Sequence, residues 1–169
     1  MEIYTTSVRG GGALKVTDND TDDLYPSYSP TGNNIAYEGY DGNDSEIYTI
    51  NAAGTGGTSK VTDNDSDDSQ PDYSPDGKTI VYVGYPPGSQ EYDGTNEAIY
   101  TIGVSGGGSR FKVVDDASEP SYSPSGGSIA YLADAAANPA IYTIGVGGRG
   151  KVKVTDDGAA VSGPSWGSR

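Results

Sequence analysis

Two runs of acidic residues are spaced like the ligands of a metal ion. The segments DNDTDD (18–23) and DNDSDD (63–68) place carboxylates at positions i, i+2 and i+4. Oxygen ligands at that spacing open the calcium-binding loop of an EF-hand. The sequence therefore predicts a candidate Ca²⁺ site in each run, and it suggests no other cofactor. The ligands would be Asp18, Asp20 and Asp22 in the first run, and Asp63, Asp65 and Asp67 in the second.

A second interpretation of these runs needs no metal. The sixth residue of an EF-hand loop is glycine and the twelfth is glutamate. Here the sixth residue is Asp23 or Asp68, and the twelfth is Ser29 or Ser74. Asp and Asn side chains also accept hydrogen bonds from nearby backbone N–H groups and so stabilise tight turns. The sequence leaves both interpretations open.

The composition excludes several classes of function. The chain has 169 residues, which suits one domain, and it contains neither His nor Cys. Ser-His-Asp and Cys-His nucleophiles, zinc fingers and disulfides are therefore excluded. With 10 Lys and Arg against 24 Asp and Glu, the net charge is −14, which argues against a nucleic-acid partner. We also expect no membrane insertion, because no apolar run approaches the roughly 20 residues of a span, and we expect no signal peptide in this chain.

Short motifs recur along the whole sequence. The motif EIYT or AIYT begins at residues 2, 46, 98 and 140, at spacings of 44, 52 and 42 residues. The motifs KVTD, PSYSP and IAY recur between them, and the long second spacing contains one insertion, PPGSQEYDGTN (86–96). A fixed period of this length indicates an array of structural repeats.

Each repeat contains four short segments rich in Tyr, Ile, Val and Thr, separated by clusters of Gly, Asp, Asn and Pro. Such segments are typical of strands. In the turns SPTG, SPDG and SPSG, proline presets φ and glycine accepts a positive φ, which favours a tight hairpin. The sequence therefore predicts an all-β protein, a β-propeller of four-stranded antiparallel blades.

The repeat KVTDN…PDYSPDGK…IVY…IYTI closely resembles that of the TolB-like β-propellers, with its best match at 60–77, Tyr82 and 98–104. Thr31 and Ser125 depart from it, since the family turn prefers Asp there. The resemblance implies a propeller fold and a periplasmic or extracellular location. Proteins of this family serve as protein-binding platforms in bacterial envelopes, as accessory domains of peptidases and, in a minority, as polysaccharide-processing enzymes.

The strand order of the family divides residues 1–169 into a single module of three complete blades with partial blades at both ends. A leading c–d pair covers 2–18, the full blades cover 26–63, 71–115 and 120–156, and a trailing strand a covers 164–168. Three arrangements would cover the open ends: two chains forming an eight-bladed ring, one chain closing as a four-bladed ring, or assembly as a fragment of a larger propeller. We favour the homodimeric ring, because symmetric closure is common.

That strand order also predicts a polarised charge distribution. The d-to-a and b-to-c loops share one face and carry most of the 24 acidic residues. Neither set of loops contains a Lys or Arg, and we expect the basic residues Arg9, Lys60, Lys78, Arg110, Arg149 and Lys151 beside the opposite hairpins. A face of one sign attracts cations and basic partners.

We therefore predict a non-catalytic binding scaffold that offers this acidic face to a protein or peptide. The candidate contact residues lie in or near the b-to-c loops: Tyr40, Asp41, Asp44, Tyr85, Tyr92 and Asp93. The alternatives are a carbohydrate-active or peptidase-associated propeller and a structural fragment of a larger propeller that self-assembles. Glycoside hydrolysis uses a pair of carboxylates, and a chain with so many acids has many possible pairs. Nothing in the sequence distinguishes a catalytic pair from the other acids of the loops.

Overall fold

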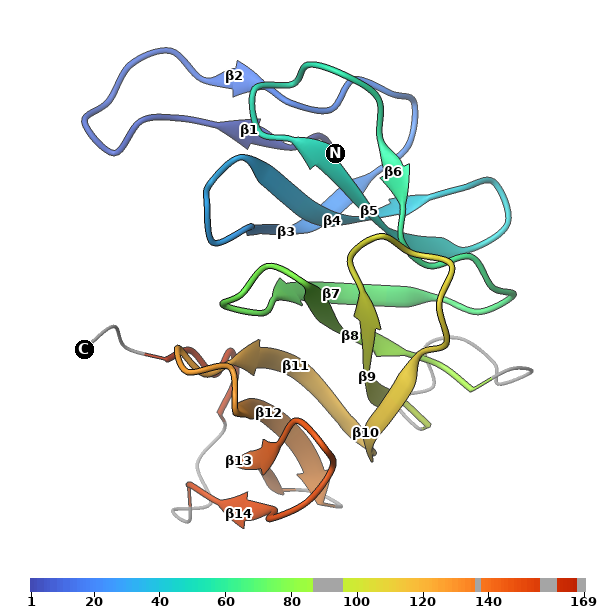
Figure 1. The fold of residues 1–169 in the computed structure, drawn as a ribbon, viewed down its shortest axis with the longest axis vertical. Coiled ribbons are helices and arrows are strands. Elements are labelled where there is room, and N and C mark those ends of the chain that lie inside the picture. The colour runs from blue at the N-terminus through green and yellow to red at the C-terminus, as the bar shows by residue number, and fades with distance from the viewer. Residues whose placement is uncertain (87–95, 136–137, 156–160, 167–169) are drawn as a thin grey trace.

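The computed structural model describes residues 1–86, 96–135, 138–155 and 161–166, and this part of the chain contains strands and no helix. Accordingly, it contains no helix long and apolar enough to span a membrane. A two-stranded sheet comes first, formed by β1 (Tyr4–Thr5) and β2 (Leu14–Lys15). Three four-stranded antiparallel sheets follow along the chain (Figure 1).

Neighbouring strands of each four-stranded sheet follow one another in the sequence. The first sheet contains β3 (Asp23–Tyr28), β4 (Asn34–Tyr40), β5 (Ser45–Asn51) and β6 (Ser59–Lys60). The second sheet contains β7 (Asp68–Tyr73), β8 (Thr79–Gly84), β9 (Ala98–Gly103) and β10 (Phe111–Asp115). The third sheet contains β11 (Ala117–Tyr122), β12 (Ser128–Ala135), β13 (Asn138–Gly145) and β14 (Val152–Lys153). The predicted all-β fold of four-stranded blades is confirmed.

The hairpin between the first two strands of each sheet has the predicted turn chemistry. In the second sheet, Gly77 has φ +71°, and the Ser74 hydroxyl accepts a hydrogen bond from the Thr79 N–H at 3.0 Å. Asp76 accepts hydrogen bonds from Ser74 and from the Lys78 N–H. In the first sheet Thr31 replaces this Asp, and its hydroxyl contacts Ser29 at 3.4 Å instead. The departure from the family turn therefore leaves the hairpin intact.

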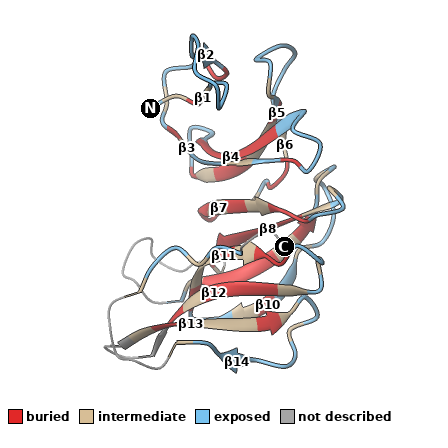
Figure 2. Ribbon diagram, turned by 90° about the vertical axis from the view of Figure 1, so that its left-hand side faces the viewer, coloured by how far each residue is buried: buried red, intermediate tan, exposed pale blue. Residues whose placement is uncertain are grey.

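The sheets stack face to face, with apolar side chains between them. Ala36, Ile47 and Val61 of the first sheet pack against Ile80 and Tyr82 of the second, and an equivalent cluster joins the second sheet to the third. Figure 2 shows that burial is greatest in the middle strands and low at β2 and β14. One pair of stacked tyrosines recurs in each sheet with ring centroids 5.8 Å apart: Tyr37–Tyr48, Tyr82–Tyr100 and Tyr131–Tyr142.

The first strands of successive sheets lie side by side, since β3 contacts β7 and β7 contacts β11. Asp72 links all three sheets at this point. Its carboxylate accepts hydrogen bonds from the Ser27 hydroxyl at 2.9 Å and from the Tyr122 N–H at 2.8 Å. The strands that carry the PSYSP motif or its variant PDYSP therefore lie next to one another along the stack.

The two ends of the stack lie far apart in Figure 1, so a single chain does not close into a four-bladed ring. Equivalent residues show the consequence. Val61 and Val113 are 2% and 6% exposed, whereas Val154 of the last sheet is 57% exposed. No strand is assigned to 161–166, where Trp166 donates its indole N–H to the Ser121 carbonyl at 3.0 Å. The predicted trailing strand is thus not formed over 164–166, and 167–168 lie outside the described residues.

Candidate functional site

The acidic runs form hydrogen-bonded loops organised by an asparagine. The Asn64 side chain donates a hydrogen bond to Asp68 at 2.7 Å and accepts one from the Ser66 hydroxyl. The Asn64 backbone N–H donates to the Glu46 carboxylate at 2.6 Å. Asn19 makes the corresponding bonds in the first run, with Asp23, Thr21 and Glu2 as its partners. The bond from the Thr21 N–H to Asn19 is the local kind that the second interpretation predicts, whereas the bonds to Glu2 and Glu46 tie each loop to a more distant part of the chain.

The carboxylates of each predicted calcium triad point to different partners. Asp18 and Asp63 bind Lys15 and Lys60, three residues before them. Asp67 accepts a hydrogen bond from the Ser45 N–H at 2.7 Å, while Asp20, Asp22 and Asp65 are exposed. The structure does not bring these ligands together, because consecutive residues of a tight turn present their side chains in different directions.

A different group of three carboxylates does converge. Within the described part of the chain, the only three carboxylates whose oxygen atoms lie within 4.8 Å of one another belong to Asp41, Asp44 and Glu46. They surround the β4–β5 turn. Asp41 is exposed, but Asp44 and Glu46 are 5% and 0% exposed. Sequence spacing alone misses this group, because Glu46 belongs to the strand that follows the turn.

Several of the acids near this turn have perturbed pKa values. Burial raises the pKa of Glu38 to about 7, and burial likewise raises the pKa of Asp44, with the nearby charges of Asp41 and Asp67 adding to the effect. The Lys60 ammonium, 2.7 Å away, lowers the pKa of Asp41 to about 2. The surroundings of this turn therefore favour the protonated forms of Glu38 and Asp44 and the charged form of Asp41.

The expected separation of basic from acidic residues is wrong in part. Lys15, Lys60 and Lys112 each pair with the Asp three residues later. Arg110 reaches Asp68, with 3.6 Å between the charged atoms. Lys60 and Arg110 were expected beside the opposite hairpins. Their long side chains instead extend from the last strand of the sheet to the acidic loops, which partly neutralises those loops.

The predicted contact residues differ in accessibility. Tyr40 is 48% exposed and Asp41 is exposed. Asp44 and Tyr85 are buried, and the Tyr85 hydroxyl donates to Glu97 at 2.9 Å, so neither is available to a partner as we expected. Tyr92 and Asp93 lie outside the described residues.

A cleft of about 580 Å³ lies beside Tyr40, between the β2–β3 loop and the β5–β6 hairpin. Its lining includes Asp18, Asp23, Tyr40, Tyr48 and Thr58. Asp23 is 3% exposed, and burial raises its pKa. The cleft thus combines a buried carboxylate with aromatic faces, and the sequence alone gave no reason to group these residues.

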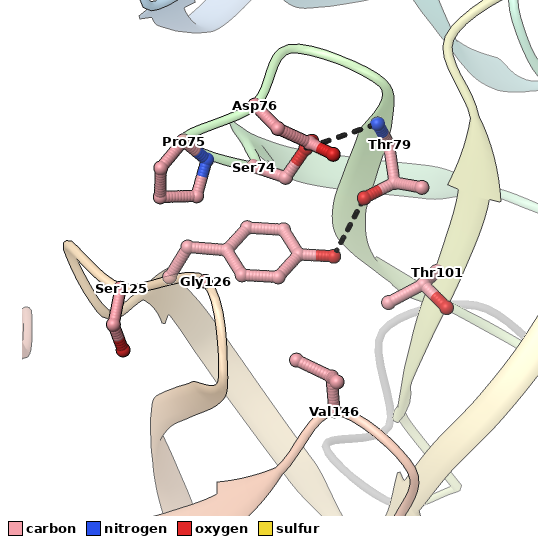
Figure 3. A pocket seen from close by; sticks show the side chains of 9 residues that line it. Ser74, Pro75, Asp76, Thr79, Thr101, Ser125, Gly126 and Val146 are labelled. Carbon is pink, nitrogen blue, oxygen red and sulfur yellow. Dashed lines mark hydrogen bonds between the residues drawn. The ribbon is translucent and has the colours of Figure 1, made fainter.

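Another cleft, of about 480 Å³, lies between the first hairpins of the second and third sheets (Figure 3). It is lined mainly by Ser, Thr, Pro and Gly, and the Tyr122 hydroxyl lies 3.1 Å from the Thr79 hydroxyl within it. Asp76 is the one acidic residue in its lining. This cleft opens beside hairpins that alternate with the acidic loops along the chain, and it offers few charged groups to a ligand.

The repeated sheet, its stacked tyrosines and its acidic loops define the class of protein: these are successive blades of a β-propeller. The chain belongs to the TolB beta propeller domain family, whose model matches residues 1–169. A search of curated protein sequences found no match to the chain.

Solved structures show the same fold. The chain is similar to a putative TolB from Agrobacterium tumefaciens (22% identity, TM-score 0.76), with 90% of this chain and 55% of that chain covered. It is also similar to TolB from Acinetobacter baumannii (21% identity, TM-score 0.75), with 91% and 37% covered. An oligogalacturonate lyase in complex with manganese is more distant (16% identity, TM-score 0.65), with 94% and 45% covered. The chain therefore spans about half or less of the length of these proteins.

Proposed function

We propose that this chain is a non-catalytic scaffold that binds a protein or peptide partner through its acidic face. The acidic face consists of exposed acids at the end of the last strand, or in the loop after it, in the two-stranded sheet and in the first two four-stranded sheets: Asp18, Asp20, Asp22, Asp63, Asp65, Asp115 and Asp116. The repetition of exposed carboxylates at equivalent positions is the observation that carries the proposal. Membership of the TolB propeller family supports it, and a periplasmic or extracellular location follows as part of the same proposal.

The chemistry of the acidic face favours a basic partner. Each loop contains more carboxylates than the cationic groups that pair with it, so an excess of negative charge faces solvent. Charges arranged in this way raise the association rate of an oppositely charged partner, and salt screens that attraction. Tyr40, which is 48% exposed, adds an aromatic contact beside the acids.

We further propose that two chains associate to cover the open ends of the stack. Tyr28 of the first sheet is 54% exposed, whereas its equivalents Tyr73 and Tyr122 are 6% and 8% exposed. Val154 is uncovered at the other end of the stack. A second chain that supplied a neighbouring blade at each end would bury both residues, as the internal sheets already do for their counterparts.

The test is binding of a synthetic peptide of alternating Gly and Arg to the full chain by isothermal titration calorimetry. Its affinity should fall at least about tenfold as NaCl rises from about 50 to about 300 mM, because salt screens exposed charges. Replacing Asp20 and Asp65 by Asn should weaken binding. Asp76→Asn removes one exposed acid beside the hairpins of the Figure 3 cleft and should not weaken it.

Binding that is insensitive to salt, or that Asp76→Asn weakens as much as the acidic-face variants do, would refute the proposed contact surface. Depolymerisation of oligogalacturonate by the purified chain would overturn the non-catalytic assignment in favour of a carbohydrate-active propeller.

A further inference from the structure

The second sheet contains an arginine held at three points. The Arg110 guanidinium lies 4.2 Å from the centroid of the Tyr100 ring. One of its nitrogens lies 3.6 Å from the Asp68 carboxylate, and another donates a hydrogen bond to the Tyr85 carbonyl at 3.2 Å. The aromatic face, the carboxylate and the carbonyl thus surround the guanidinium, with the carboxylate acting as a charge partner beyond hydrogen-bond distance.

The first sheet repeats these three groups at equivalent positions. Asp23 pairs with Gly39 as Asp68 pairs with Gly84, and Tyr48 stacks on Tyr37 as Tyr100 stacks on Tyr82. Tyr40 follows Gly39 in the chain as Tyr85 follows Gly84. The counterparts of the three groups that hold Arg110 are therefore Tyr48, Asp23 and the Tyr40 carbonyl.

The cation itself is missing from the first sheet. Arg110 lies two residues before Lys112, whose counterpart is Lys60, so Thr58 occupies the position of the arginine. A threonine side chain is too short to reach the tyrosine pair. In the described part of the chain, cations lie over Tyr100, Tyr131 and Tyr142, but none lies over Tyr48.

The two clefts differ in size in the direction expected when a short side chain replaces an arginine. The cleft beside Arg110 measures about 290 Å³ and is lined by Val61, Thr62, Asp63, Asn64, Tyr82, Ile102, Gly107, Gly108 and Arg110. The cleft in the first sheet has the equivalent lining but measures about 580 Å³. Its additional lining includes Asp23, Gly39, Tyr40 and Tyr48. These are the counterparts of the groups beside Arg110.

We infer that the cleft lined by Asp23, Tyr40, Tyr48 and Thr58 binds an arginine side chain of the partner. This inference deepens the proposed function, on which it rests, by assigning one residue type to the basic partner. The bound guanidinium would stack on Tyr48, pair with Asp23 and donate to the Tyr40 carbonyl, as Arg110 does within the chain.

The third sheet indicates why the ligand is arginine rather than lysine. There Lys151 lies 4.4 Å from the centroid of the Tyr142 ring, and the position of the buried acid is occupied by Ala117. The chain thus pairs a lysine with a site that lacks the carboxylate and an arginine with a site that has it. The first sheet has the carboxylate, Asp23, and therefore matches the arginine site.

The probe is arginine blocked at both ends, N-acetyl-L-arginine amide, titrated into the full chain while the ring signals of Tyr48 are followed by NMR. The matching citrulline compound has nearly the same shape without the charge. Saturable shifts with arginine, and at least about tenfold weaker binding of citrulline, are the expected result, because charge assists both polar contacts. Equal binding of the two compounds, or the absence of saturable shifts, overturns the inference.

A pair of variants tests the site from within. Thr58→Arg should fill the cleft with the chain's own guanidinium, abolish binding of the probe and raise the thermal unfolding midpoint. Thr55→Arg adds the same charge to the same exposed hairpin, outside the cleft, and should leave probe binding unchanged. If Thr58→Arg still binds the probe, or is no more stable than Thr55→Arg, the inference is wrong.

The same variants separate this inference from the proposed function. If the Gly-Arg peptide binds Thr58→Arg as tightly as it binds Thr55→Arg, the arginine site is refuted while the acidic face remains the contact surface. If arginine binds the cleft but the peptide shows no salt-dependent binding, the proposed function fails and the site stands.

A separate observation carries a second proposal. Both carboxylate oxygens of Asp44 are buried without a hydrogen-bond partner. One of them lies within 4.8 Å of an oxygen of Asp41 and of Glu46, whose carboxylates share the single cation Lys60 at 2.7 and 3.7 Å. Buried carboxylate oxygens are costly unless they are paired or coordinate a metal. We propose that these three residues bind Ca²⁺, which takes several oxygen ligands in flexible geometry.

Terbium is the probe for this second site, because nearby tyrosines sensitise its luminescence when it occupies a calcium site. Wild-type protein should give luminescence that Ca²⁺ displaces, and Asp44→Asn should reduce Tb³⁺ affinity at least about tenfold by removing one charged ligand. Asp20→Asn is the matched control from an acidic run and should leave the signal unchanged. The proposal fails if no displaceable signal appears, or if Asp20→Asn abolishes it while Asp44→Asn does not.

Discussion

Replacing Gly84 by alanine should destabilise the protein, because Gly84 lies directly beside a buried carboxylate. A Cβ atom at this position would lie 2.5 Å from the Asp68 carboxylate and 3.2 Å from the rings of both Tyr82 and Tyr100. Asp68 is fully buried and is held by Asn64, so it has little freedom to move away. The added methyl group must therefore displace well-packed neighbours.

The expected cost follows from these contacts. Overpacking a core by one methyl group typically costs about 1–3 kcal/mol, and a 2.5 Å approach to a held carboxylate places Gly84→Ala toward the upper end. Gly39→Ala is the matched control, because the equivalent Cβ would lie 3.2 Å from Asp23. Its cost should be about 1 kcal/mol or less, since a shift of a few tenths of an ångström relieves the contact.

The third sheet suggests the compensating change. At the positions of the Asp–Gly pair it has Ala117 opposite Ala133. Asp68→Ala alone should cost about 1–3 kcal/mol, because it removes the short hydrogen bond to the Asn64 amide and the carboxylate beside the Arg110 guanidinium. Asp68→Ala with Gly84→Ala reproduces the alanine pair, so its cost should be smaller than the sum of the two single costs by about 1 kcal/mol or more.

Urea unfolding of the four variants, followed by circular dichroism, measures these differences, and urea leaves the ion pairs unscreened. The reasoning is refuted if Gly84→Ala is no more destabilising than Gly39→Ala, or if the double variant is additive.

Three further predictions concern pH, binding and assembly. Burial raises the pKa of Asp72. At a pH between the pKa values of Asp72 in the unfolded and folded chains, the folded chain therefore binds more protons than the unfolded chain. The free energy of unfolding should fall as pH rises through that range. Asp72→Asn can still accept the Tyr122 N–H and should reduce this slope in urea melts from pH 4 to 7. Arg110→Thr should open a second arginine cleft, seen as a second binding event in the probe titration. Tyr28→Glu or Val154→Glu should shift a dimer toward monomer in sedimentation experiments, and an unchanged mass in both would contradict the two-chain ring.

The sequence predicts the strands and hairpins well, because their signals are local. The SPDG turn needs only Ser74, Pro75, Asp76 and Gly77, and each acts on a neighbour within five residues. The four-stranded sheet follows from alternation and repeat length in the same way. Even the departure at Thr31 has no consequence, because its hydroxyl makes a similar local contact with Ser29.

The candidate site was harder to predict, because its contacts join residues from different strands. Arg110 meets Tyr100 and Asp68 across the sheet, and sequence spacing gives no hint of that meeting. The carboxylates of the predicted acidic triads do not converge, for the opposite reason: they point in different directions from the turn, and two of them bind local partners, Lys15 and Lys60. Tyr40 and Tyr85 both follow the glycine that ends the second strand's apolar segment, yet they differ in exposure, and the bond from the Tyr85 hydroxyl to Glu97 is a contact that spacing does not predict.

The differences between repeats are more informative about function than the repeats themselves. Asp occurs opposite Gly in two sheets and Ala occurs opposite Ala in the third, so these pairs are explained by packing. The replacement of arginine by Thr58 is not accompanied by such a matching change. The first sheet keeps Asp23, Tyr40 and Tyr48, the counterparts of the groups around Arg110, but has no cation among them. A buried carboxylate retained without its cation weakens the fold unless a ligand supplies the charge. We therefore expect a partner to supply the missing positive charge beside Thr58. In Thr58→Arg the chain would supply that charge itself.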